Sequence, residues 1–258
     1  MGFFNDVWNI IVKYHDMLLS GLGYTMLIAL IGTVAGLVIG IIIGIVRTIP
    51  KSHSKGIRVI QKIIDVILTV YIEVFRGTPM MVQAMVIFWG YAFASGGNTL
   101  PIIPAGIFIV SINTGAYMAE IVRGGIISID KGQFEGAQSI GMTHFQVMIH
   151  VVIPQAMRNI LPSISNEFVI NIKDTSVLNV IGVMELYWQA TKIQTMNYQI
   201  FQTYVIISIM YFVMTFTVTR ILRLFEKLLE GKNTYTIHGS QSDPTAEIRI
   251  KEETHSHG

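Results

Sequence analysis

Ionisable residues are scarce in this chain of 258 residues. Lys, Arg, Asp and Glu together make up 13% of the sequence, whereas hydrophobic residues make up 52% and the mean hydropathy is +0.56. Few soluble domains of this length have such a composition, so the sequence points to a membrane protein. Cysteine is absent, and its absence alone says little about the compartment.

Several chemical signatures are also missing. The sequence has no G-x-x-x-x-G-K-[ST] phosphate loop, so we expect that this chain does not hydrolyse ATP by itself. It has no paired-carboxylate, Ser-His-Asp or metal-ligand pattern that would indicate an intramembrane enzyme. His144 and His150 have a poor metal spacing, and His255 and His257 are most simply incidental residues of a polar tail. We therefore expect no metal or cofactor in this chain and no nucleic-acid partner.

Long apolar runs are abundant. A helix needs about 20 apolar residues to cross the hydrocarbon core of a bilayer, and the uncharged runs 18–46, 102–119 and 201–219 come close to or exceed this length. Two more runs, 66–94 and 155–186, are long enough but are interrupted by charges and proline. Because no run alternates with a period of two, a β-barrel is excluded. We predict an all-α, polytopic membrane bundle of about five transmembrane helices.

The positive charges gather on one side of this predicted bundle. Five Lys and Arg residues lie between positions 47 and 62, and the cluster 220–227 falls on the same side, whereas the opposite side receives Lys13 and Lys192. The positive-inside rule then places the N-terminus outside and the C-terminus in the cytoplasm of a multi-pass cell-membrane protein.

The chain divides into two parts by composition. Residues 1–230 hold all the apolar runs and form the predicted membrane domain, with one long cytoplasmic loop at about 130–154. Residues 231–258 are polar and poor in large apolar groups, so we expect a flexible cytoplasmic tail.

The loop at 130–154 has the pattern of two short helices joined by a bend. Asp130 and Thr143 each stand three residues before a glutamine, which is the capping-box spacing. Gly141 lies between the two helices, where a helix end commonly needs a left-handed residue. The first helix is expected to present Phe134, Ala137, Gln138 and Gly141 along one side and Glu135 on another.

The sequence EGAQSIGMTHFQVMIHVVIP, which begins at Glu135, resembles the EAA loop of ABC importer permeases. It departs mildly from that motif at Gly136, Val151 and Ile153. The resemblance implies that this cytoplasmic loop docks onto a separate ATPase subunit. The docking residues it implies are Glu135, Gly136, Ala137, Gln138 and Gly141. An ordinary interfacial helix is the alternative, but such helices favour a basic polar face, and this segment has hardly any basic residues.

The run 66–94 is broken at YIEVFRGTPM. Gly77 and Pro79 interrupt the helix, while Glu73 and Arg76 share one face and are spaced to form a pair. Charges at membrane depth usually face a cavity or a partner. The segment resembles the E-x-x-R-G-T-P signature of the polar amino acid uptake family. Glu73 and Arg76 are therefore candidates for substrate selection or gating, unless they merely end a helix near the cytoplasmic interface.

The run 155–186 carries a second polar group. Glu167, Asn171 and Asp174 follow at i, i+4 and i+7 and form one stripe. Lys173 and Asp174 could bracket a zwitterion, with the ammonium near a substrate carboxylate and the carboxylate near the α-amine. The I-K-D-T-S segment again resembles the polar amino acid permeases. The alternative is a salt-bridged polar seam between subunits.

The first run contains Gly32, Gly36, Gly40 and Gly44 at a period of four. Such a stripe forms a groove that admits a neighbouring backbone. We expect it to serve helix packing, within the subunit or across a dimer, rather than gating.

The resemblance to the polar amino acid permeases covers about residues 21–223 and rests on three motifs, the EAA-like loop, the E-x-x-R-G-T-P segment and the I-K-D-T-S segment. It implies a type I ABC importer permease. The resemblance implies two permease subunits (a homodimer or a heterodimer), an ATPase dimer that binds ATP and Mg, and an extracellular or periplasmic solute-binding protein that delivers a polar or charged amino acid. An ion-gradient-driven secondary transporter also uses broken helices, but it gives no reason for a docking loop. A membrane anchor or regulatory subunit would not require Lys173 and Asp174. The observation that would discriminate best among these classes is whether one adjacent gene encodes a phosphate-loop ATPase and another a secreted binding protein.

Overall fold

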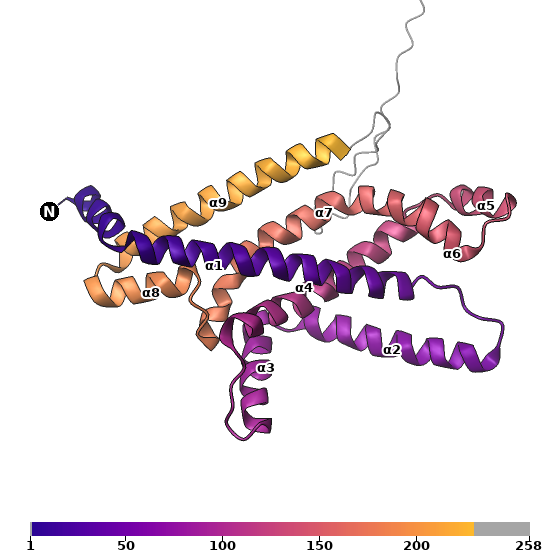
Figure 1. Cartoon of the computed structure of the whole chain (residues 1–258), viewed down its shortest axis with the longest axis horizontal. Helices are drawn as coiled ribbons and strands as arrows, with labels where there is room; N and C mark the ends of the chain where they lie inside the picture. The colour runs from indigo at the N-terminus through magenta and orange to yellow at the C-terminus, as the bar shows by residue number, and fades with distance from the viewer. Residues whose placement is uncertain (1, 230–258) are drawn as a thin grey trace, which may run out of the picture.

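The computed structural model describes residues 2–229, and every regular element within that range is a helix, as Figure 1 shows. The elements are α1 (Phe3–Val46), α2 (Lys55–Gly77), α3 (Met80–Ala94), α4 (Ile102–Ile127), α5 (Lys131–Ser139), α6 (His144–Val147), the π-helix η1 (Met148–Val152), α7 (Ile153–Asp174), the 3-10 helix η2 (Thr175–Ile181), α8 (Leu186–Asn197) and α9 (Ile200–Leu229). Helices α1, α4 and α9 are long and apolar enough to cross a membrane. The predicted all-α bundle is confirmed. The predicted tail at 231–258, with His255 and His257, lies outside the described residues.

Helix α1 runs along the length of the bundle with α4 beside it (Figure 1). The four glycines of its stripe each face α4, and a Cβ atom at Gly32, Gly36 or Gly44 would come within 2.5 to 2.7 Å of Val110, Thr114 or Val122. At Gly40 the added atom would meet Met118 more closely still. The facing residue advances in step with the glycine, so the two helices run parallel. The prediction of helix packing is confirmed, and the partner is in the same chain.

Helix α4 is the centre of the core. Toward one end, its Ile109 joins Ile28 of α1, Phe88 of α3 and Leu178 of η2 in one buried cluster. Toward the other end, its Val122 and Ile126 belong to a second cluster with α5, η1 and α7. We call these the α8 end and the α5–α6 end of the bundle, after the short helices that lie at each.

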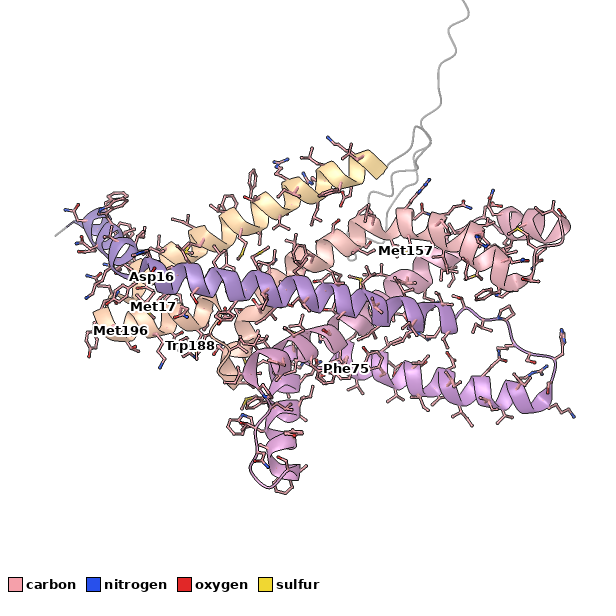
Figure 2. The ribbon with its side chains drawn as sticks, in the orientation of Figure 1. Asp16, Met17, Phe75, Met157, Trp188 and Met196 are labelled. Atoms are coloured by element: carbon pink, nitrogen blue, oxygen red, sulfur yellow. The ribbon has the colours of Figure 1, made fainter. Side chains whose placement is uncertain are left out.

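The run 66–94 is broken where the sequence indicates. Helix α2 ends at Gly77, and Pro79 is the N-cap of α3, which projects away from the bundle's long axis (Figure 1). Gln83 donates to the backbone oxygens of Phe75 and Thr78, each at 2.9 Å. Figure 2 places Phe75 where α2 meets α3 and α4. These bonds matter because a broken helix in a membrane must satisfy its freed backbone groups within the protein.

The run 155–186 is not one continuous helix. Helix α7 ends at Asp174, η2 follows, and Gly182 turns the chain with a φ of 88°. Glu185 then caps α8, accepting from the backbone N–H groups of Tyr187 at 2.7 Å and Trp188 at 2.8 Å. The Tyr211 hydroxyl of α9 donates to the same carboxylate at 3.0 Å. This fully buried side chain therefore starts α8 and ties it to α9.

Candidate functional site

The α5–α6 turn has a defined geometry set by its own residues. Gly141 has a φ of 87°, its N–H donates to the Gln138 oxygen at 2.9 Å, and the Met142 N–H reaches the Ala137 oxygen at 3.3 Å. This pair of bonds is a Schellman motif, which satisfies the last carbonyls of a helix and requires a left-handed residue. The predicted role of Gly141 in the bend is confirmed.

Both α5 and α6 begin at side-chain caps. Thr143 and Gln146 form a complete capping box, with the Thr143 N–H donating to Gln146 Oε1 at 2.9 Å and the Gln146 N–H donating to Thr143 Oγ1 at 3.3 Å. Asp130 accepts from the Gly132 N–H at 2.6 Å. Its expected partner Gln133 instead accepts from Gln155 of α7 at 3.4 Å. The second box is thus confirmed, whereas the first is a simple cap.

The side of α5 that carries Phe134 and Ala137 faces the bundle. Ala137 is buried and Phe134 is half-buried, and both pack into the cluster with Val147 and Val152. Ala137, one of the docking residues that the resemblance implies, therefore supports the turn from inside and does not offer its side chain to a partner. The exposed residues of the turn include Glu135, Gly136, Gln138, Gly141, Ile140, which is 78% exposed, and Phe145, which is 72% exposed.

The sequence contains a signal that Ile140 and Phe145 belong to a contact site. Both are large apolar residues in a polar loop, and their exposure on a turn that is otherwise fastened to the bundle is typical of a protein contact site. The loop is thus rigid on its inner side and apolar at its tip, which suits a docking element.

A second group of polar residues lies at the middle of the bundle. Asn171 of α7 donates to Thr33 Oγ1 of α1 at 2.7 Å and to Thr114 Oγ1 of α4 at 3.0 Å, and Thr114 donates back to Asn171 Oδ1 at 3.1 Å. Thr33 stands near the centre of the apolar run 18–46. We infer that this hydrogen-bonded group of Asn171, Thr33 and Thr114 lies near mid-depth in a bilayer.

The other predicted site residues stand near the same level. Glu167, Lys173 and Asp174 lie within about one helical turn of Asn171. On α2, Phe75 accepts through its backbone oxygen from Asn113, the neighbour of Thr114, at 3.3 Å. Glu73 and Arg76 flank this position, so the five ionisable groups lie within about one helical turn of the level of Asn171 and Phe75.

These groups differ in exposure within the single chain. Glu167 and Asn171 are buried, Asp174 is half-buried, and Glu73, Arg76 and Lys173 are exposed. Within residues 2–229 none of the five ionisable groups forms an ion pair with another residue. The spacing that favours a Glu73–Arg76 pair is not used, since the Arg76 guanidinium lies over the Tyr117 ring at 5.4 Å. Exposed charges at this depth need a polar path or a second subunit.

Three supporting residues were not expected from the sequence. Gln83 and Asn113 join through a 2.9 Å hydrogen bond and hold the α2–α3 break that positions Arg76. Glu185 fixes α8 at the far end of the run that carries Lys173. Polar residues inside apolar runs were the available signal, but their partners are remote in the sequence.

Comparisons with known proteins agree with this architecture. The family described as "Binding-protein-dependent transport system inner membrane component" matches residues 36–231. The L-cystine transport system permease protein TcyB of Bacillus subtilis (strain 168) is 38% identical over 165 residues, which are 64% of this chain and 70% of that protein. The glutamine transport system permease protein GlnP of Escherichia coli (strain K12) is 36% identical over 161 residues, 62% of this chain and 74% of that protein.

Solved structures show the same fold. A crystal structure of an amino acid ABC transporter with histidines has 38% sequence identity and a TM-score of 0.73, over 88% of this chain and 99% of that chain. An inward facing conformation of the MetNI methionine ABC transporter shares the fold at a TM-score of 0.64 and 16% identity, over 82% of this chain and 97% of that chain. These matches favour the importer over an ion-gradient-driven carrier. The chain belongs to the binding-protein-dependent transport system inner membrane components and is a membrane permease subunit of an ABC importer, not an enzyme.

Proposed function

We propose that this subunit forms the translocation path for a polar or charged amino acid. The observation that carries the proposal is the set of ionisable groups on α2 and α7 near the level of Asn171 that form no ion pair within residues 2–229. Among them, Lys173 and Asp174 are able to face the carboxylate and the α-amine of a zwitterion. The relatives named for cystine and glutamine transport support an amino acid as the substrate class.

The proposal includes the assembly. A second permease subunit, the same or different, faces the exposed charges; an extracellular or periplasmic solute-binding protein delivers the amino acid; and an ATPase dimer binds ATP and Mg. The N-terminus lies outside and the C-terminus in the cytoplasm, in keeping with the positive-inside rule. The α5–α6 end is then cytoplasmic and available to the ATPase.

The packing offers a route for coupling. The inner side of α5 contacts the cluster that contains Ala156 and Ile160 of α7. Lys173 and Asp174 stand at the other end of α7. When ATP binding closes the ATPase dimer and draws the two docking loops together, the displacement is passed along α7 to the polar group. Hydrolysis reverses it.

Asn171 has a different part in this proposal. Its amide already bonds Thr33 and Thr114, so it fastens α7 to α1 and α4 in this conformation. We keep it and Glu167 as candidates for contact with the substrate only when the helices separate. Lys173 and Asp174 are the primary pair, and Glu73 and Arg76 serve selection or gating.

Uptake of labelled amino acids by cells that carry the intact importer tests the substrate path. Lys173→Met and Asp174→Asn should each weaken apparent affinity by at least about tenfold, because a hydrogen bond to a charged group contributes about 1.5 to 3 kcal/mol. Lys192→Met is the matched control, since Lys192 is an exposed lysine of α8 that lies over the Trp188 ring. Wild-type rates and affinity in both test variants would show that the pair is structural.

A further inference from the structure

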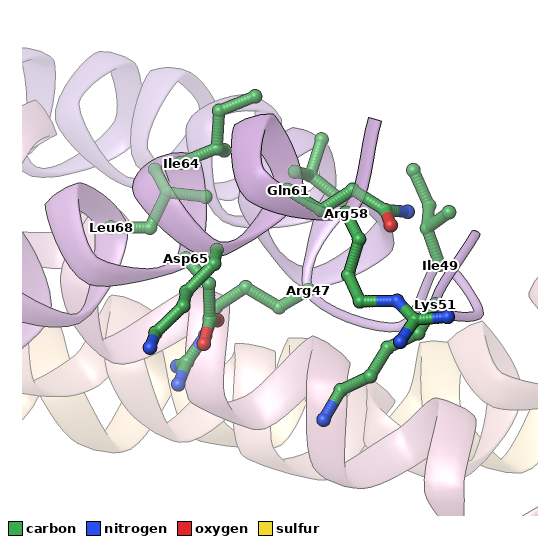
Figure 3. A pocket seen from close by; sticks show the side chains of 10 residues that line it. Arg47, Ile49, Lys51, Arg58, Gln61, Ile64, Asp65 and Leu68 are labelled. Carbon is green, nitrogen blue, oxygen red and sulfur yellow. The ribbon is translucent and has the colours of Figure 1, made fainter. Parts of the chain in front are cut away.

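A cavity of about 520 Å³ lies between α2 and the linker that joins it to α1. Figure 3 shows the side chains that surround it. The basic residues among them are Arg47, Lys51, Arg58 and Lys62, and the acidic one is Asp65. Apolar side chains, including Ile49, Ile64 and Leu68, form the rest of the lining. The cavity is thus basic on one part of its wall and apolar on another.

The linker wall is held in place by hydrogen bonds from α2. Gln61 donates to the Pro50 oxygen at 3.0 Å and accepts from the Ser52 N–H at 2.9 Å. Arg58 donates to the Ser52 oxygen at 3.1 Å. These bonds give the cavity a fixed wall instead of a loose loop.

The basic residues of the cavity are not equally available to a ligand. Arg47 forms ion pairs with Asp65 at 3.4 Å and with Glu120 of α4. Lys51, Arg58 and Lys62 form no ion pair with any residue in the described range. The cavity therefore presents three cations beyond those that its acidic neighbours neutralise, and it suits an anion.

The surface beside the cavity is apolar. The first turns of α2 expose Ile57, Val59, Ile60 and Ile63, each more than half exposed. Together with Ile64 and Leu68 they form a surface that fits hydrocarbon rather than water. An anion with an attached apolar chain matches both parts of the wall.

We propose that this cavity binds the phosphate-bearing headgroup of an anionic phospholipid, with the acyl chains lying along α2. The side of the membrane rests on the orientation under the proposed function, in which the α5–α6 end is cytoplasmic and the cavity meets the inner leaflet. Basic pockets at this level are where anionic headgroups bind. The lipid would hold the linker and the first half of α2 against α1 and α4.

The test is a titration of the purified, assembled transporter with phosphatidylglycerol or phosphatidylcholine, with bound lipids counted by native mass spectrometry. Wild-type protein should retain phosphatidylglycerol more tightly. Each lysine near an anionic surface strengthens binding about fivefold, so Lys51→Gln with Lys62→Gln should weaken retention about 25-fold. Arg58 is left in place to keep its bond to the linker. The matched control is Arg223→Gln with Lys227→Gln on α9, outside the cavity, which should bind as wild type does.

Charge, not shape, should govern the result, so Lys51→Arg with Lys62→Arg should bind like the wild type. Equal retention by the glutamine variant and the wild type would overturn the proposal. An equal loss in the α9 control would also overturn it, because it would show only a general surface charge effect. Displacement of the lipid by inorganic phosphate alone would assign the cavity to a free phosphate ion instead. Because retention is read without transport, failure here would leave the transport assignment standing.

Discussion

At the scale of single residues, Gly36 is a position at which the space between α1 and α4 excludes any side chain. A Cβ added there would lie 2.7 Å from Thr114 Cβ and 3.1 Å from the backbone nitrogen of Gly115. Backbone cannot rotate away as a side chain can, so α1 and α4 would have to separate. Small residues at such a crossing are what allow two membrane helices to pack closely.

We therefore expect Gly36→Ala to destabilise the subunit by about 1 to 3 kcal/mol, the usual cost of overpacking. Gly23→Ala is the control, because Gly23 lies in the same helix with nothing within 4 Å of an added Cβ. Alanine is intrinsically better than glycine in a helix by about 1 kcal/mol, so this variant should be no less stable. Thermal unfolding in detergent measures both, and equal shifts would disprove the close approach.

Asn171 is a second position at which one side chain is expected to determine stability. Asn171→Ala should cost about 1 to 3 kcal/mol, because it leaves buried hydroxyl groups of Thr33 and Thr114 without this partner. Asn166→Ala, an exposed position on the same helix, should be close to neutral. Stability should fall more than the apparent affinity for the amino acid. A loss of affinity without loss of stability would instead make Asn171 a direct substrate contact.

At the scale of elements, the α5–α6 turn is the part whose form depends on one backbone conformation. A β-branched residue is strongly disfavoured at a φ of 87°, and residues held in such a region cost about 1 to 3 kcal/mol. Gly141→Val should therefore misdirect the turn and reduce substrate-stimulated ATP hydrolysis by the assembled importer, while membrane insertion survives. Gly124→Val, at an exposed helical glycine with open space around it, is the control. Normal coupling in both would argue against docking by this turn.

The same turn shows which features a sequence can predict. Gly141 and the Thr143–Gln146 box are local patterns, and the structure confirms both. Whether Ala137 faces out or in depends instead on the buried cluster that it joins, whose other members come from α4, η1 and α7. Local spacing carries no information about that packing, so the sequence groups residues on one side of α5 but does not say which side faces the bundle.

The interrupted runs 66–94 and 155–186 show the same contrast between local patterns, which the sequence predicts, and contacts between remote residues, which it does not. Gly77 and Pro79 mark the α2–α3 break in the sequence because they act through their own backbone. The Gln83–Asn113 bond that closes the break joins residues 30 positions apart. Helix α8 was missed since its cap is Glu185, and glutamate is not among the preferred N-cap residues. The candidate site residues could be chosen from the sequence. Their burial and their hydrogen-bond partners could not, because these depend on residues remote in the chain.

At the scale of the whole molecule, the fold separates two surfaces. The α5–α6 end exposes Ile140 and Phe145 on a rigid turn, and the charges on α2 and α7 lie near the middle of the bundle. Helices α4 and α7 connect the two. An importer permease needs this arrangement, because work done at the ATPase must reach a path that the ATPase does not touch.

Contact between the α5–α6 turn and the ATPase is the central claim, and crosslinking tests it most directly. The chain has no cysteine, so Phe145→Cys gives this subunit a single site, which is labelled with a photoactivatable sulfhydryl reagent before the importer is assembled. Phe93→Cys is the control, because Phe93 is 91% exposed but lies at the end of α3, away from the turn. In the assembled importer we expect adducts to the ATPase from position 145 and none from position 93. An intact complex without adducts from position 145, or with equal adducts from both positions, would contradict the account.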